Sequence, residues 1–98
     1  MTTESLIGGE GEAAVVALRA LSWILGDDRR ARRFLDLTGL SPERLRSSLD
    51  DRAALAAVLD FLVNHEADLN AAAAAIAIAP QRVVAARDAL ADADGEIL

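Results

Sequence analysis

The stretch from residue 50 to residue 64, DDRAALAAVLDFLVN, constrains the fold more than any other part of the chain. Its large aliphatic side chains recur at the three- and four-residue spacing of one helix face: Leu55, Val58, Leu59 and Leu62. Phe61 and several alanines widen that face. Asp50 or Asp51 can cap the start, because a short carboxylate accepts hydrogen bonds from the free backbone N–H groups there. The pattern predicts a central helix that its neighbours cover on more than one side.

The composition favours helices in the rest of the chain as well. Alanine and leucine are abundant, whereas the sequence holds two Phe, one Trp and no Tyr. Alanine propagates a helix and lets neighbouring helices approach closely, and a β fold would call for more Thr and Tyr. A chain of 98 residues suits one domain with a modest core. We therefore expect an all-α fold, a compact orthogonal bundle of five or six short helices.

Turn and capping residues divide the remainder of the chain into further helices. Gly26 and Gly39 suit helix ends, because glycine accepts the left-handed conformation that closes a helix. Ser41-Pro42-Glu43 is typical of a helix start, since serine caps and proline needs no N–H in the first turn. The expected helices besides the central one span residues 12–25, 27–38, 42–49, 67–77 and 80–91. The expected division is a mobile segment at 1–11, one helical domain at 12–91 and a frayed tail at 92–98.

The same helical spacing predicts which apolar side chains face the core. In the first helix these are Val15, Leu18, Leu21 and Leu25. In the later helices they are Phe34, Leu35, Leu37, Leu45, Leu49, Val83, Val84 and Leu90. Val16, Trp23 and Ile24 lie off the first face. These three residues, with Val63 and Val84, give the chain more apolar surface than so small a domain readily covers. The surplus predicts an exposed apolar patch that binds a partner.

The two halves of the chain share a pattern when one is shifted by 38 residues. Residues 21–25 then align with residues 59–63, and residues 40–45 align with residues 78–83. Each half contains a long helix, a tight break, a helix and a helix that begins with proline. Two interpretations stay open. Either the fold contains two pseudo-repeated three-helix halves, or the halves match only because any helical chain resembles itself when its helices stay in phase.

Several function classes lack their sequence signals. The chain has no cysteine, so disulfides and thiol chemistry are excluded. The beginning of the sequence shows no basic segment followed by an apolar run, and no apolar stretch reaches membrane-spanning length without a charge or a proline. We therefore expect a cytoplasmic protein with no membrane partner. No glycine-rich phosphate loop, paired carboxylate site or ligand cluster is recognisable, so we expect no enzyme, cofactor or metal.

His65 is the only histidine and a weak candidate for a metal ligand. Glu66 and Asp68 could add ligand atoms, but their spacing from His65 does not bring the three side chains onto one ion. A cap at a helix junction or an exposed ring is the favoured interpretation. Asp60, on the polar side of the central helix, is expected to be exposed.

Arginines form the densest charge cluster of the chain, at Arg29, Arg30, Arg32 and Arg33. They could bind phosphate or an acidic partner, or they could form a solvated helix face balanced by the nearby aspartates, with Arg32 reaching Asp36. Residues 1–49 carry seven arginines and seven acidic residues, so their net charge is zero. Residues 50–98 carry three arginines and nine acidic residues, a net charge of −6. Any phosphate contact is therefore expected in the first half.

Two segments resemble a helix-turn-helix in rhythm, FLDLTGLSPERLRSSL and AAAAAIAIAPQRVVAARDAL. The second helix of such a motif reads DNA with its first turn. The residues at those positions are Glu43, Arg44, Gln81 and Arg82, and Arg46 and Arg87 follow them. The acidic net charge and the absence of lysine favour a packing motif that does not bind DNA.

Most of the chain resembles a family of short bacterial proteins of unknown function, found mainly in alphaproteobacteria. The residues that carry the resemblance are Leu21–Leu25 with the acidic break after them, Arg33–Leu40, and Val58–Leu62. The resemblance implies a compact helical fold and supplies no functional residues. The chain departs from the family pattern at Ala71–Ala75, where larger side chains are expected.

The leading hypothesis is a non-enzymatic protein-interaction module, with self-association as one form of it. The residues proposed for the partner surface are Trp23, Arg29, Arg30, Arg33, Arg44 and Arg46. The alternative is a nucleic-acid-binding regulator that uses the arginines of the second and third helices. No residue is proposed for catalysis, for a cofactor or for a metal.

Overall fold

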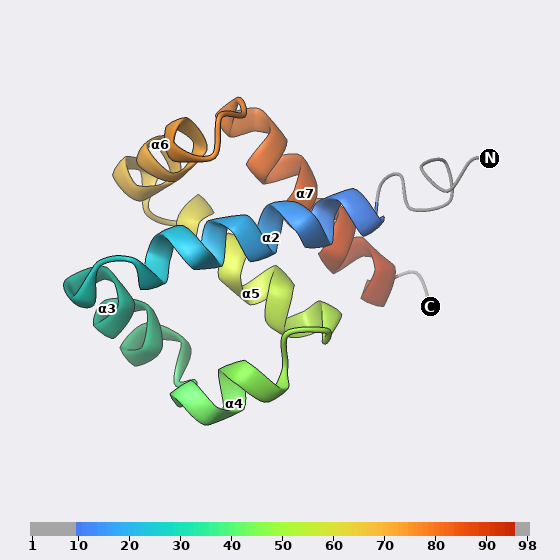
Figure 1. The fold of residues 1–98 in the computed structure, drawn as a ribbon. Helices are drawn as coiled ribbons and strands as arrows, with labels where there is room; N and C mark the ends of the chain where they lie inside the picture. Colours follow the sequence, from blue (N-terminus) through green and yellow to red (C-terminus); the bar gives the residue numbers. More distant parts are fainter. Residues whose placement is uncertain (1–9, 96–98) are drawn as a thin grey trace.

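Six α-helices follow one another in the computed structural model, which describes residues 10–95, with side chains described for residues 11–91. They are α2 Glu10–Leu25, α3 Asp28–Thr38, α4 Pro42–Ser47, α5 Arg52–Val63, α6 Glu66–Ala75 and α7 Pro80–Gly95 (Figure 1). The predicted all-α class is confirmed. Of the segments predicted to lack structure, residues 1–9 and 96–98 lie outside the described residues. Residues 10–11 begin α2, and residues 92–95 continue α7 past its predicted end.

Side-chain caps hold three helix starts, and two of them, at Ser41 and Asp51, are predicted from the sequence. The side chains of Asp27, Ser41 and Asp51 each accept a hydrogen bond of 3.1 Å from a backbone N–H in the first turn of α3, α4 and α5. Gly39 ends α3 with φ of +74°, and its N–H donates to the Leu35 carbonyl. Local chemistry therefore sets these helix boundaries.

α5 is the central helix, as the sequence predicts. It packs against α2, α6 and α7, and α7 also packs against α2 (Figure 1). The side chains of Val58, Leu59 and Leu62 are fully buried. Phe34 of α3 meets Phe61 of α5 edge to face, with their ring centroids 5.3 Å apart, which fixes α3 against the centre of the molecule.

α2 buries a different face from the predicted one. Its core residues are Ala13, Val16, Ala17, Ala20, Leu21 and Ile24. Val15, Leu18 and Leu25 are instead 40–50% exposed. Three alanines on the buried side let α5 and α7 pack against α2, and Leu21 is the one predicted core residue of this helix that is buried. Val16 and Ile24, which were predicted to belong to an exposed apolar patch, are also buried.

Two further apolar predictions are wrong. Leu37 is 59% exposed, because α3 packs mainly through Phe34 and leaves its last turn open. Leu49 is 38% exposed, because α4 ends at Ser47 and Leu49 lies in the connection to α5. Leu45 remains the one fully anchored side chain of α4.

The helices recur at the shift of 38 residues. α2 and α5 end at residues 25 and 63, α3 and α6 begin at 28 and 66, and α4 and α7 begin at 42 and 80. Among the described residues, only Gly39 and Ala77 have positive φ, +74° and +63°, and they occupy corresponding positions. The third helices differ, because α4 has six residues and α7 has sixteen.

The alanine run at Ala71–Ala75 contributes to the core on one side only. Ala72 and Ala73 are buried, whereas the other three alanines are exposed. No single helix within residues 10–95 is long and apolar enough to cross a membrane. The bent pair α6 and α7 reaches that length and composition only with a 103° angle between its helices.

Candidate interaction surface

Arg30 and Trp23, both proposed for the partner surface, contact each other. The Arg30 guanidinium carbon lies 3.7 Å from the centroid of the Trp23 ring, a cation–π contact. Arg30 Nη2 donates a 2.5 Å hydrogen bond to the Trp23 carbonyl, one of the carbonyls that the end of α2 leaves free. Arg30 also forms an ion pair with Asp27. The contacts of Arg30 and Trp23 therefore hold α2 against α3, and few groups of these two side chains are free to bind a partner.

Asp27 receives charge and hydrogen bonds from the start of α3. The backbone N–H of Arg30 donates to its carboxylate, which holds the pKa of Asp27 below its ordinary value, and the positive charge of Arg30 adds to the effect. Asp27 is therefore a structural cap, and its negative charge partly offsets the arginines beside it.

Arg33 is also engaged within the chain. It forms an ion pair with Asp68 of α6, and its guanidinium lies over the Phe61 ring at 5.8 Å. Arg33 thus links the two halves of the molecule. The sequence could not show this contact, because the two partners are 35 residues apart.

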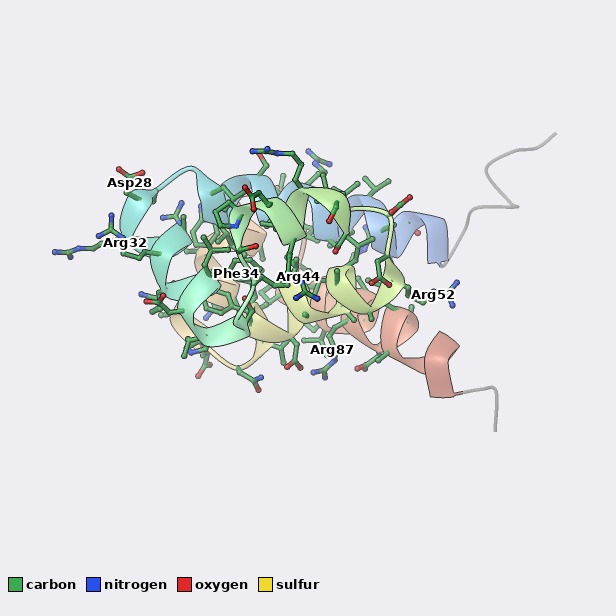
Figure 2. All side chains as sticks on the ribbon, turned by 90° about the horizontal axis from the view of Figure 1, so that it is seen from below. Asp28, Arg32, Phe34, Arg44, Arg52 and Arg87 are labelled. Atoms are coloured by element: carbon green, nitrogen blue, oxygen red, sulfur yellow. The ribbon has the colours of Figure 1, made fainter. Side chains whose placement is uncertain are left out.

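The other arginines of α3 and α4 remain exposed. Among the described residues, no ion pair involves Arg29, Arg32, Arg44 or Arg46. Figure 2, seen from the side of α4, shows Arg32 projecting outward from α3 while Phe34 points inward. The predicted pair between Arg32 and Asp36 is not among these contacts. α3 and α4 together carry six arginines and three acidic residues.

The second helix-turn-helix-like segment has no such free arginines. Arg82 pairs with Glu12 of α2, and Arg87 pairs with Asp60 and Asp88. The hydrogen bond to Asp88, with help from that to Asp60, holds the pKa of Arg87 above its ordinary value. Asp60 is exposed, as predicted. α6 and α7 together carry two arginines and five acidic residues, so their charge is opposite to that of α3 and α4.

His65 stands at the junction of α5 and α6, as predicted. Its ring Nδ1 lies 2.6 Å from the carbonyl oxygen of Phe61. A carbonyl only accepts, so Nδ1 carries the hydrogen. The ring therefore closes the end of α5 and does not cap α6. Within the described residues, no group of three or more His, Asp or Glu side chains is placed to hold a metal ion.

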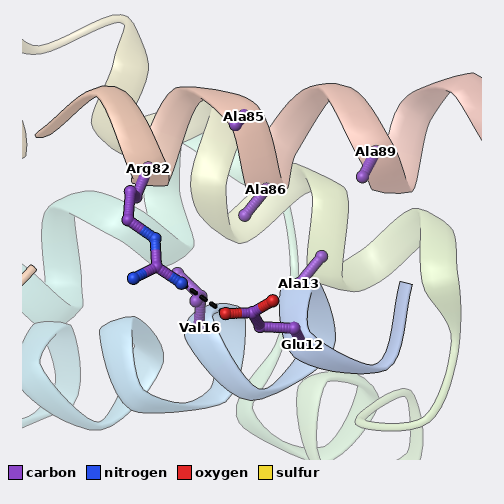
Figure 3. A pocket seen from close by; sticks show the side chains of 7 residues that line it. All are labelled: Glu12, Ala13, Val16, Arg82, Ala85, Ala86 and Ala89. Carbon is purple, nitrogen blue, oxygen red and sulfur yellow. Dashed lines mark hydrogen bonds and ion pairs between the residues drawn. The ribbon is translucent and has the colours of Figure 1, made fainter. Parts of the chain in front are cut away.

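A shallow cavity of about 150 Å³ lies between α2 and α7. Figure 3 shows the ion pair of Arg82 and Glu12 across it, with Ala13, Ala86 and Ala89 around it. The two charged groups satisfy each other, and the other lining side chains are small and apolar. The cavity offers no nucleophile and no acid–base pair.

An apolar groove between α2, α3 and α4 is the surface that the sequence analysis missed. Its volume is about 210 Å³, and six apolar residues line it: Leu21, Leu25, Leu35, Pro42, Leu45 and Leu49. Arg46 is its one charged lining residue. We call this hollow the α2–α4 groove. Its signal in the sequence is Leu49, an apolar residue at the end of the short helix predicted over residues 42–49, but the helical spacing predicts that this side chain faces the core.

The exposed apolar surface continues from the groove along α2. Leu18 lies seven residues before Leu25, and Val15 three before Leu18, so the three side chains share one side of the helix. This side of α2 is the face that the sequence analysis placed in the core. The structure therefore gathers apolar surface at α2 and α4, away from the predicted patch.

The comparisons with known proteins give a family and no function. A family model described as "protein of unknown function (DUF3572)" matches residues 10–93. No curated protein and no solved structure matches the chain.

Proposed function

The chain belongs to the DUF3572 family of proteins of unknown function, and we propose that it is a non-enzymatic protein-interaction module that binds through the α2–α4 groove. The observation that carries this proposal is the exposure of Leu25 and Leu49 on the two sides of the groove. Leaving adjoining apolar side chains in water is unfavourable, and covering them with a partner recovers that free energy. Exposed apolar patches of this kind mark interfaces.

The proposed surface replaces most of the predicted one. The side chains of Trp23, Arg30 and Arg33 make their contacts within the chain. Arg46 is retained because it lines the groove. Self-association remains one form of the proposal, with a second copy as the partner.

A pull-down with matched variants tests the proposal. The tagged full chain, its Leu49→Glu variant and its Leu37→Glu variant are each incubated with soluble extract of the host cell, with and without nuclease. We expect a protein that the wild type and Leu37→Glu recover, that Leu49→Glu loses, and that nuclease does not remove. Leu37 is the control because it is an exposed leucine outside the groove. Identical recovery by all three chains would contradict the proposal.

Nucleic-acid binding is the second candidate function. It is favoured by the unpaired, exposed arginines of α3 and α4. It is disfavoured by the length of α4, whose six residues present little surface to a major groove. This candidate predicts affinity for mixed DNA or RNA fragments that falls steeply with salt and is lost when Arg44 and Arg46 become alanine. No binding at low salt would eliminate it.

A further inference from the structure

We infer that the α2–α4 groove receives an acidic amphipathic helix of another protein, which inserts one large apolar side chain and places its carboxylates near the arginines of α3 and α4. This inference rests on the proposed function and names the chemistry of the partner. It follows from the size of the groove, the direction of the apolar surface and the distribution of charge.

The size of the groove selects one inserted side chain. Pockets that bury a small-molecule ligand measure about 300–1,000 Å³, and the groove measures about 210 Å³ and is open to solvent. A hollow of this size suits a single anchor residue of a protein partner. Such an anchor is typical of interfaces in which a few buried side chains carry most of the binding free energy.

The direction of the exposed apolar surface selects a helix. From Val15 to Leu25 the surface follows α2 for roughly 15 Å, at the rise of 1.5 Å per residue of an α-helix. A partner helix of three turns would cover this length with apolar residues at positions i, i+3 or i+4, and i+7. The described residues contain no strand, so they offer no sheet edge to an extended peptide.

The charges around the groove select acidic flanks on that helix. Arg46 lines the groove, and α3 and α4, which supply three of its apolar residues, carry six arginines against three acidic residues. Arg29, Arg32 and Arg44 of these helices have no ion pair within the described residues. Carboxylates on a partner could therefore form ion pairs with these arginines. A basic partner would instead be repelled as it approached.

The acidic helices of the chain itself lie elsewhere. α6 and α7 carry the opposite charge, but they pack against α2 and α5 and take no part in lining the groove. The unpaired arginines are therefore available to another molecule.

An unbiased peptide selection tests the inference. Random sixteen-residue peptides are displayed and selected on the full chain, with counter-selection on Leu49→Glu. We expect the enriched peptides to be rich in Asp and Glu, to carry apolar residues at helical spacing, and to become helical on binding. The binding of one labelled peptide is then measured by fluorescence anisotropy.

Matched variants locate that binding. Leu49→Glu and Leu25→Gln are each expected to weaken it by about tenfold or more, the effect of losing an anchor contact. Leu37→Glu is expected to leave it unchanged. Arg46→Glu should weaken it more than Arg44→Glu, because only Arg46 lines the groove. Replacing the carboxylates of the peptide with lysine should abolish it.

The outcomes separate the inference from the proposed function. Enriched peptides that need Leu49 but are neutral, basic or extended would overturn the acidic helix and leave the groove as an interface. Finding no peptide that needs Leu49 would overturn both. A dimer of the wild type in sedimentation, lost in Leu49→Glu, would make a second copy the occupant and would also overturn the inference.

Discussion

The two halves of the molecule use the same helix order for different purposes. α2 and α5 end at corresponding residues, and their matching positions Leu21 and Leu59, and Ile24 and Leu62, are all buried. α7 then packs against both of these helices, whereas α4 makes only slight contact with the other helices. The long third helix of the second half completes the core. The short third helix of the first half leaves the α2–α4 groove open.

The second helices differ in chemistry at four corresponding positions. α3 has Asp27, Arg30, Phe34 and Gly39 where α6 has His65, Asp68, Ala72 and Ala77. α3 is thus fixed by a side-chain cap, a cation–π contact, a large aromatic anchor and a glycine turn. α6 packs through Leu69 and two small side chains, Ala72 and Ala73. A shared backbone scheme therefore tolerates two ways of holding a helix, and each pair of positions can be tested by substitution.

The aromatic anchor should give the largest effect. Phe34→Ala removes a fully buried ring that meets Phe61, so we expect the free energy of unfolding to fall by about 3–5 kcal/mol. Urea denaturation followed by circular dichroism measures the change. Leu37→Ala, on the exposed side of the same helix, should stay within about 0.5 kcal/mol. A loss of under about 1 kcal/mol in Phe34→Ala would mean that α3 is not held by this ring.

The contact between Arg30 and Trp23 should come next. Arg30→Gln removes the cation–π contact and the charged hydrogen bond to the Trp23 carbonyl, so we expect a loss of about 1–2 kcal/mol. Acrylamide should then quench the fluorescence of Trp23, the only tryptophan, more strongly. Arg29→Gln is the control, because Arg29 is exposed and unpaired within the described residues. Equal effects of the two substitutions would show that the contact between Arg30 and Trp23 does not stabilise the protein.

The two residues with positive φ should respond in opposite directions. Gly39→Ala places a side chain in a left-handed conformation, and we expect it to destabilise the protein by about 1 kcal/mol. A Cβ at Gly39 would meet nothing within 4 Å, so the effect comes from the backbone alone. Ala77→Gly relieves the same strain but adds freedom to the unfolded chain, so we expect a gain of about 0.5 kcal/mol. Thermal melting of both variants measures the changes, and shifts of the same sign would contradict the correspondence.

The smallest effect should be the pH dependence of the Asp27 cap. Its pKa is lower in the folded protein than in the unfolded chain, so the contribution is present above the unfolded pKa of about 3.9 and is lost as the pH falls through the folded pKa. Asp27→Asn keeps a capping oxygen without titrating. We expect the wild type to lose more stability than Asp27→Asn between about pH 5 and pH 3. Urea denaturation across this range compares them, and parallel profiles would contradict the assignment.

The sequence predicted the helices better than their contacts. The end at Gly39 and the starts at Ser41 and Asp51 follow from chemistry that acts over a few residues, and the structure confirms them. The buried face of α2 was missed, because a helix rich in alanine shows little contrast between its sides. The larger side chains seemed to mark the core face, but close packing placed the alanines there.

The same contrast holds for the candidate interaction surface: the sequence predicted which residues are unusual but not what they contact. The sequence identified the arginines of α3 and α4 as unusual. It could not separate Arg30 and Arg33, whose partners lie on other helices, from Arg46, which lines the groove. The α2–α4 groove itself is lined by residues from 21 to 49 that meet only after three helices have packed.

The amino-acid sequence alone thus determined the all-α class, the order of the helices with several of their limits, and the unequal charges of the two halves. These properties depend on propensities, caps and composition, which are local or additive. The tertiary structure decided which leucines are exposed, which arginines contact other residues of the chain, and where the groove opens. Those properties depend on the distance of approach between helices that are far apart in the chain, and local patterns do not encode that distance.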